Sequence, residues 1–149
     1  MDNPDISTES SRRVTEKLMA QLEAGGSITA FFEDNPSDFL PYSFQEIISP
    51  VIQSKKVTAA SLVRESGINR RYYFEILSGR KRPTRNYVLR ILLALKLPVQ
   101  DAQWILRASG YPQMYVRNKR DAVMIYAFER SLSVKECNIM LQKIELELI

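Results

Sequence analysis

The stretch TAASLVRESGINRRYYFEILSGRKRP, residues 58–83, decides the fold of this chain. Its pattern predicts two short helices joined by a tight turn and followed at once by a basic loop. Gly67 suits the turn because glycine adopts the left-handed conformation without strain. The pattern therefore predicts a helix-turn-helix, in which the second helix is presented outward beside the first.

Polar residues stand where the two predicted helices begin. Thr58 and Asn69 are expected to cap the two N-termini, because their side-chain oxygens accept hydrogen bonds from free backbone amides. The second helix is predicted over 70–78, with Tyr73 and Ile76 near one face. Gly79 is expected to end it.

Basic residues concentrate in and around this stretch. Residues 55–90 hold ten of them: Lys55, Lys56, Arg64, Arg70, Arg71, Arg80, Lys81, Arg82, Arg85 and Arg90. With Glu65 and Glu75 the segment carries 10 − 2 = +8, and because the whole chain carries +4, the remainder sums to −4. A basic focus of this kind is typical of proteins that contact DNA phosphates. For charge clustering alone, a solvated basic face without a partner is the alternative.

The region from about Phe44 to Gly110 resembles the Xre/Cro–lambda-repressor type of DNA-binding domain. The resemblance is carried by SGINRRY, by the LSGRKRPT that follows it, and by LALKLPVQDA. Related bacterial regulators also continue with a segment like GYPQMYVRNKRDAVMIYAFERSLSVKECNIML. The resemblance implies an all-α fold with a domain of about five helices. It also implies a sequence-specific transcriptional regulator of bacterial or phage type that binds double-stranded DNA as a homodimer.

Site residues are expected along the second motif helix and the basic loop. Arg70 and Arg71 would reach the bases, since the first turn of that helix meets base edges. Contacts to phosphates are expected from Lys56, Arg80, Lys81, Arg82 and Arg85. Asn69 would cap the helix and touch the DNA backbone. Thr58, Phe74 and Glu75 complete the set, with Glu75 able to accept from a cytosine amino group.

Several positions depart from the pattern of the family. Val63 stands where a small alanine is usual, and Tyr73 replaces a buried aliphatic residue. Phe74 and Leu77 occupy places where DNA readers more often carry polar side chains. Together with Trp104 they motivate an alternative, a protein-interaction adaptor that keeps the helix-turn-helix fold without operator binding.

Composition argues against catalysis. The chain has no histidine and one cysteine, Cys137, which removes the usual catalytic triads and metal-ligand sets. No glycine-rich phosphate loop is present. We therefore expect no enzyme activity, no cofactor and no metal. One cysteine, no apolar run of membrane-spanning length and no signal-peptide core favour a cytoplasmic protein without membrane contact.

The chain divides into three predicted parts. Residues 1–40 form an acidic N-terminal helical arm, 41–110 the helix-turn-helix domain, and 111–149 a C-terminal helical hairpin for packing or dimerisation. Within the domain, Pro50 predicts a kink or early break in the first helix. Thr84 is expected to cap the helix over 85–96, whose apolar girth predicts a central core position.

The C-terminal hairpin carries two capping signals. Asn118 and Asp121 resemble a capping pair, and Ser133 with Glu136 fits the capping box. The last helix is predicted to carry an apolar stripe that extends to Leu148. Such a stripe either packs back on the domain or pairs with a second copy of the chain.

Overall fold

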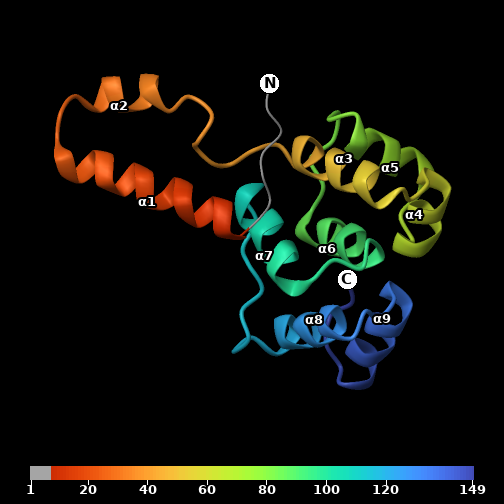
Figure 1. Cartoon of the computed structure of the whole chain (residues 1–149). Helices are drawn as coiled ribbons and strands as arrows, with labels where there is room; N and C mark the ends of the chain where they lie inside the picture. Colours follow the sequence, from red (N-terminus) through yellow and green to blue (C-terminus); the bar gives the residue numbers. More distant parts are fainter. Residues whose placement is uncertain (1–7) are drawn as a thin grey trace.

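A computed structural model describes residues 8–149, and this part of the chain is all-helical, with nine helices and no strand. Figure 1 shows a compact body with an arm that projects from it. The helices are α1 (Thr8–Ala24), α2 (Ile28–Asp34), α3 (Phe44–Lys55), α4 (Ala59–Ser66), α5 (Arg70–Leu77), α6 (Arg85–Ala94), α7 (Val99–Ala108), α8 (Lys119–Glu129) and α9 (Val134–Lys143).

Helices α6 and α7 lie at the centre of the body. Helix α6 contacts α4 and α9, whereas α7 contacts α1, α3 and α8. The side chains of Val88, Leu89, Ile91, Leu92 and Leu93 are all fully buried on α6. The apolar girth of this helix therefore follows from neighbours on several sides, and its predicted central position is confirmed.

One continuous apolar core joins the middle of the chain to its C-terminal part. Its buried hydrophobic residues run from Phe44 to Ile149 and include Met124, Cys137 and Leu141 of the last two helices. The Cys137 sulfur lies 3.5 Å from the Met124 sulfur. Cys137 and Leu141 of the α9 stripe thus pack back on the body, whereas Ile144 at its end is 53% exposed.

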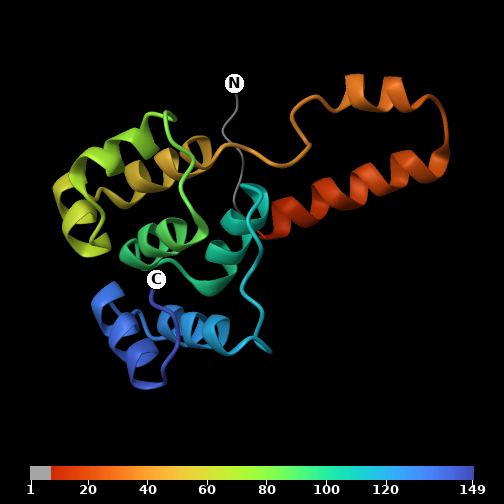
Figure 2. The ribbon, with the colours of Figure 1, turned by 180° about the vertical axis from the view of Figure 1, so that it is seen from behind.

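Helices α1 and α2 form the arm. Figures 1 and 2 show α1 leading away from the body and α2 running back toward it, before the chain reaches the start of α3. Ser27 caps α2, because its side chain accepts a hydrogen bond from the Ala30 amide. Within residues 8–40 no large hydrophobic side chain joins the core, and Met19, Ile28 and Phe32 are about half exposed. The arm is held to the body by contacts of α1 with α7.

Helix α3 runs through Pro50 without ending. Of the two expected effects of Pro50, the early break is therefore wrong, and the kink stays a prediction. Ile47, Ile48 and Val51 are buried on both sides of the proline. Their burial stabilises the helix across a residue that cannot donate a backbone hydrogen bond.

The chain end departs from its prediction. Helix α9 ends at Lys143, and Glu145 adopts a left-handed conformation with φ 59°. The amides of Glu145 and Leu146 donate to the carbonyls of Gln142 and Leu141, which is the Schellman pattern of a helix C-terminus. Leu148 is consequently exposed and does not extend the stripe, whereas Ile149 returns to the core.

Within the described residues, no helix combines the length and the apolar character that crossing a bilayer requires.

Candidate nucleic-acid interface

Helices α4 and α5 are set by caps and by one glycine. The Thr58 hydroxyl accepts from the Ser61 amide at 3.1 Å, and Gly67 ends α4 with φ 67°. Asn69 Oδ1 accepts from the amides of Arg71 at 2.9 Å and Tyr72 at 3.3 Å. Both predicted caps are thus confirmed. A turn of three residues, 67–69, separates the two helices.

Helix α5 buries one face and exposes the other. Tyr73 and Ile76 are 2% and 1% exposed, so the tyrosine occupies the core position despite its size. Burial raises the pKa of the Tyr73 hydroxyl above its usual value. Arg70 and Arg71 are exposed in the first turn. The arginines therefore point away from the packed side of the helix.

Two pairs of side chains, each four residues apart, begin in the exposed first turn of α5, and of their four members Glu75 is half-buried. The Arg70 guanidinium lies 5.5 Å from the centre of the Phe74 ring, and Phe74 is 44% exposed. Arg71 Nε lies 3.5 Å from Glu75 Oε1, with the arginine side chain 89% exposed. Such an exposed ion pair contributes little to stability. Both arginines therefore remain accessible to a partner.

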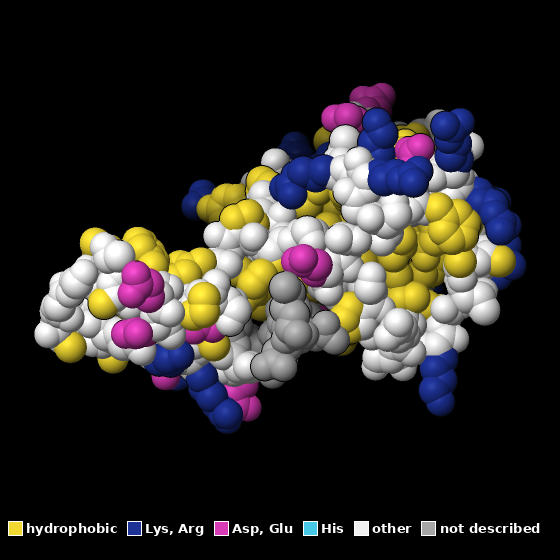
Figure 3. All heavy atoms as spheres, turned by 90° about the horizontal axis from the view of Figure 1, so that it is seen from above, with side chains coloured by type: hydrophobic (Ala, Val, Ile, Leu, Met, Phe, Trp, Pro, Cys, Tyr) yellow, Lys and Arg dark blue, Asp and Glu magenta, His cyan; other side chains and the backbone are white. Residues whose placement is uncertain are grey.

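The loop after α5 is also basic and is shaped by Gly79. This glycine has φ 83°, and a Cβ atom there would lie 2.8 Å from the Gln45 side chain. The Lys81 amide donates to the Glu75 carbonyl at 3.1 Å, so the loop folds back on α5. Arg80 and Lys81 are exposed. Figure 3 shows lysine and arginine side chains gathered over the α3–α5 part of the body, beside apolar surface.

Arg82 and Lys56 border the loop and the end of α3. Arg82 donates to the Ser109 carbonyl at 3.2 Å, and its guanidinium lies 4.4 Å from the centre of the Tyr111 ring. It is exposed nonetheless. Lys56 is exposed and left-handed, with φ 55°, at the C-terminus of α3. Contacts therefore hold the Arg82 guanidinium in place, whereas Lys56 projects from a defined backbone position beside the motif.

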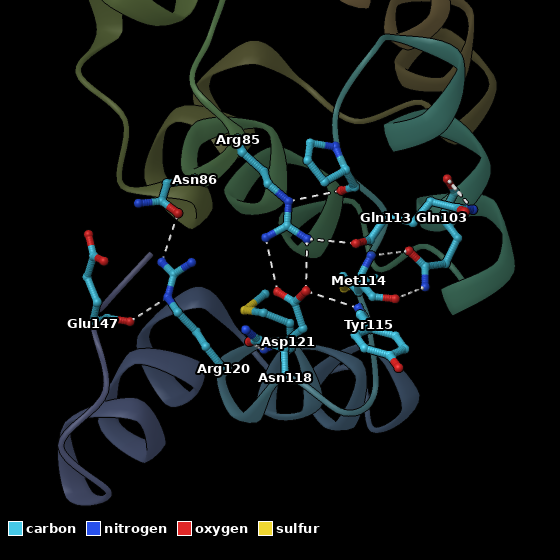
Figure 4. A network of polar contacts seen from close by, with 12 residues as sticks. Arg85, Asn86, Gln103, Gln113, Met114, Tyr115, Asn118, Arg120, Asp121 and Glu147 are labelled. Atoms are coloured by element: carbon cyan, nitrogen blue, oxygen red, sulfur yellow. Dashed lines mark hydrogen bonds and ion pairs between the residues drawn. The ribbon is translucent and has the colours of Figure 1, made fainter.

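Arg85 occupies an internal polar network instead of an open surface. It donates to both carboxylate oxygens of Asp121, at 3.0 and 3.3 Å, and to the carbonyls of Pro112 and Gln113. Figure 4 shows its guanidinium directed at α8. Its side chain is only 22% exposed. This geometry does not fit the expected phosphate contact, because the donors of Arg85 are already used to join α6 to α8.

Arg90 has a structural role in addition to its charge. Its guanidinium donates to the carbonyls of Ser66 and Gly67, at 3.2 and 3.3 Å, and to the backbone oxygen of Ile149 at 2.6 Å. It therefore links the turn between α4 and α5 to the C-terminal segment. Nothing in its sequence neighbourhood signals this role, because its partners lie 23 to 59 residues away.

A groove of about 840 Å³ lies between the arm and the body. Val14 and Leu18 of α1, Pro50 of α3 and Trp104 of α7 line part of it. Trp104 is 8% exposed, and its buried Nε1 has no hydrogen-bond partner among the described residues. Among residues 8–149 no group of acidic or cysteine side chains has the geometry to hold a metal ion.

Comparisons with known proteins add no assignment: no family model, no curated protein and no solved structure matches this chain.

Proposed function

We propose that this chain is a sequence-specific, non-enzymatic DNA-binding transcriptional regulator of bacterial or phage type that acts in the cytoplasm. In this proposal α3 to α7 form a lambda-repressor-like domain, and α5 is the helix that enters the major groove. The observation that carries the proposal is the placement of Arg70 and Arg71, exposed in the first turn of α5. The first turn of a recognition helix is the part that meets base edges.

Phosphate contacts are assigned to exposed cations around α5. These are Lys56, Arg80, Lys81 and Arg82. Arg85 is removed from this set because Asp121 and two carbonyls engage it. Thr58 and Asn69 act through the helix caps that they make. Glu75, beside Arg71, remains a candidate acceptor for a cytosine amino group.

The test is a titration of the full chain with random duplex DNA at low and moderate salt, followed by selection of bound sequences from a random pool. We expect steeply salt-dependent affinity, because binding releases counterions from the phosphates. On a selected site, Arg70→Ala and Arg71→Ala should each cost about 1–3 kcal/mol and relax preference at one position. Unchanged affinity and sequence preference in both variants would refute the base-reading assignment.

An adaptor that binds a protein and not DNA is the second candidate. Phe74 favours it, because a phenylalanine that is 44% exposed also suits a protein contact. Trp104 and Leu77 give it less support, since the first is buried and the second is half-buried. Absence of DNA affinity at low salt would favour the adaptor.

A homodimer belongs to the same proposal, because regulators of this kind bind two half-sites. The outer side of α8 and α9 offers an apolar groove of about 390 Å³, lined in part by Tyr126, Met140 and Ile144. Sedimentation velocity of the full chain, with and without a selected duplex, measures the stoichiometry directly.

A further inference from the structure

Phe74 and Arg70 form a contact on the exposed face of α5. They are four residues apart, so their side chains emerge on one side of the helix a turn from each other. The Arg70 guanidinium lies over the Phe74 ring at 5.5 Å from its centre, within the range of a cation–π contact. The aromatic ring therefore supports an arginine that would otherwise be free to move.

The ring of Phe74 is itself held in place by the buried ring of Tyr73. Tyr73, which is 2% exposed, meets it edge to face with 5.4 Å between ring centres and 81° between the planes. Edge-to-face packing is a favoured arrangement of aromatic pairs. An apolar group thus stands at a fixed position on the outer face of α5.

The two side chains match two features of the major groove. An arginine donates to guanine O6 and N7, and a phenylalanine makes apolar contact with the C5-methyl group of thymine. One helical turn rises about 5.4 Å, whereas successive base pairs are about 3.4 Å apart. Groups in contact on one turn therefore address the same base pair or neighbouring pairs.

The neighbouring pair on α5 has a different chemistry. The Glu75 carboxylate lies 3.5 Å from Arg71, and it presents an acceptor where Phe74 presents carbon. Of these two pairs, only Arg70 and Phe74 therefore combine a hydrogen-bond donor for guanine with an apolar surface for a methyl group.

We propose that Arg70 and Phe74 read a guanine and an adjacent thymine as one unit, with Phe74 contacting the thymine methyl group. The inference rests on the proposed function, since it requires α5 to enter the major groove. It adds the thymine methyl group to the features that α5 would recognise. It also assigns the exposed Phe74 to a DNA contact instead of a contact with a protein partner.

The experiment uses the full chain and the sites selected from a random duplex pool. We expect the selected sites to share a guanine with a thymine beside it. Replacing that thymine by deoxyuridine removes only the methyl group and should weaken wild-type binding about four-fold. That factor corresponds to the ~0.8 kcal/mol of one buried methyl-sized group. Phe74→Ala should bind the thymine and uridine sites equally, and Phe74→Leu should keep part of the difference.

Phe32→Ala is the matched control, because Phe32 is 51% exposed, also packs on other aromatic rings, and lies on the arm. It should retain the full four-fold difference. Circular dichroism checks that each variant is folded. If binding is sequence-selective but the uridine effect is the same in wild type and Phe74→Ala, the reading unit is refuted while the regulator stands. Absence of salt-dependent duplex binding in the wild type would overturn both.

Discussion

Asp121 is a carboxylate that is only 8% exposed, and several donors surround it. Its oxygens accept two hydrogen bonds from Arg85 and one from the Tyr115 amide at 3.0 Å. Its own amide donates to Asn118, the cap of α8. One residue therefore joins α6, the segment before α8 and the first turn of α8, as Figure 4 shows.

Removing Arg85 should destabilise the fold. Arg85→Ala leaves the Asp121 carboxylate buried without its cation, which costs about 3 kcal/mol when a buried pair loses one partner. The free energy of unfolding, measured by urea denaturation, should fall accordingly. Arg80→Ala, which changes an exposed arginine, should stay within about 0.5 kcal/mol of wild type. Equal effects of the two substitutions would contradict the structural role of Arg85.

Cys137 should make the free energy of unfolding depend on pH in the alkaline range. Burial raises the pKa of its thiol from 9.0 to about 11. Between these values the unfolded chain loses the proton and the folded chain keeps it, so the free energy of unfolding should decrease as the pH rises. Chemical denaturation from pH 8 to 11 measures this decrease. Cys137→Ala should show a smaller decrease over the same interval; an identical pH profile in the variant would exclude the thiol as a cause.

Helix ends are decided by a few neighbouring residues, although not always by glycine. Gly67, Gly79 and Gly110 end helical segments in the left-handed conformation, as glycine signals predict. After α8 and α9 the same conformation is taken by Ser131 and Glu145, with φ 52° and 59°. The predicted last helix was too long for this reason, because no glycine marks its end.

Thr58 and Thr84 allow a matched test of capping. Both precede a helix and both are exposed, but Thr58 accepts from the Ser61 amide whereas Thr84 makes no side-chain cap within the described residues. The predicted Thr84 cap was therefore wrong. Thr58→Ala should lower the free energy of unfolding by about 1 kcal/mol, and Thr84→Ala by clearly less. Equal losses in urea denaturation would show that the caps are not what distinguishes the two positions.

Local sequence patterns predicted the helices and their caps, but they did not predict contacts between residues far apart in the sequence. The Asn69 cap and the Ser133–Glu136 capping box involve residues within three positions, so their chemistry is readable in the sequence. Arg85 is bound 36 residues away, at Asp121. In the sequence it looked like one more cation of the basic segment. Composition places a charge on the chain but does not say whether another side chain will neutralise it.

The whole molecule separates charge along its length. Residues 55–90 sum to +8 and the rest to −4. Residues 9–40 of the arm carry six acidic and three basic side chains. The acidic residues are Glu9, Glu16, Glu23, Glu33, Asp34 and Asp38, and the basic residues are Arg12, Arg13 and Lys17. Figure 1 shows α1 and α2 directed away from α4 and α5. This arrangement keeps most of the arm's acidic groups away from the basic surface. In the proposed function, a DNA duplex at α5 would therefore meet mainly cations.

The salt dependence of DNA binding should follow the position of each cation and not the total charge. Lys81 lies in the loop after α5, whereas Lys135 lies on α9, and both are exposed. Each phosphate that loses its lysine partner reduces the slope of log K against log salt by about one. Lys81→Ala should therefore flatten the slope and weaken binding to all sequences alike, and Lys135→Ala should leave the slope unchanged. Fluorescence anisotropy between about 50 and 200 mM salt resolves such a change. Equal slopes for both variants would mean that the duplex is attracted by net charge and does not dock on the α5 side.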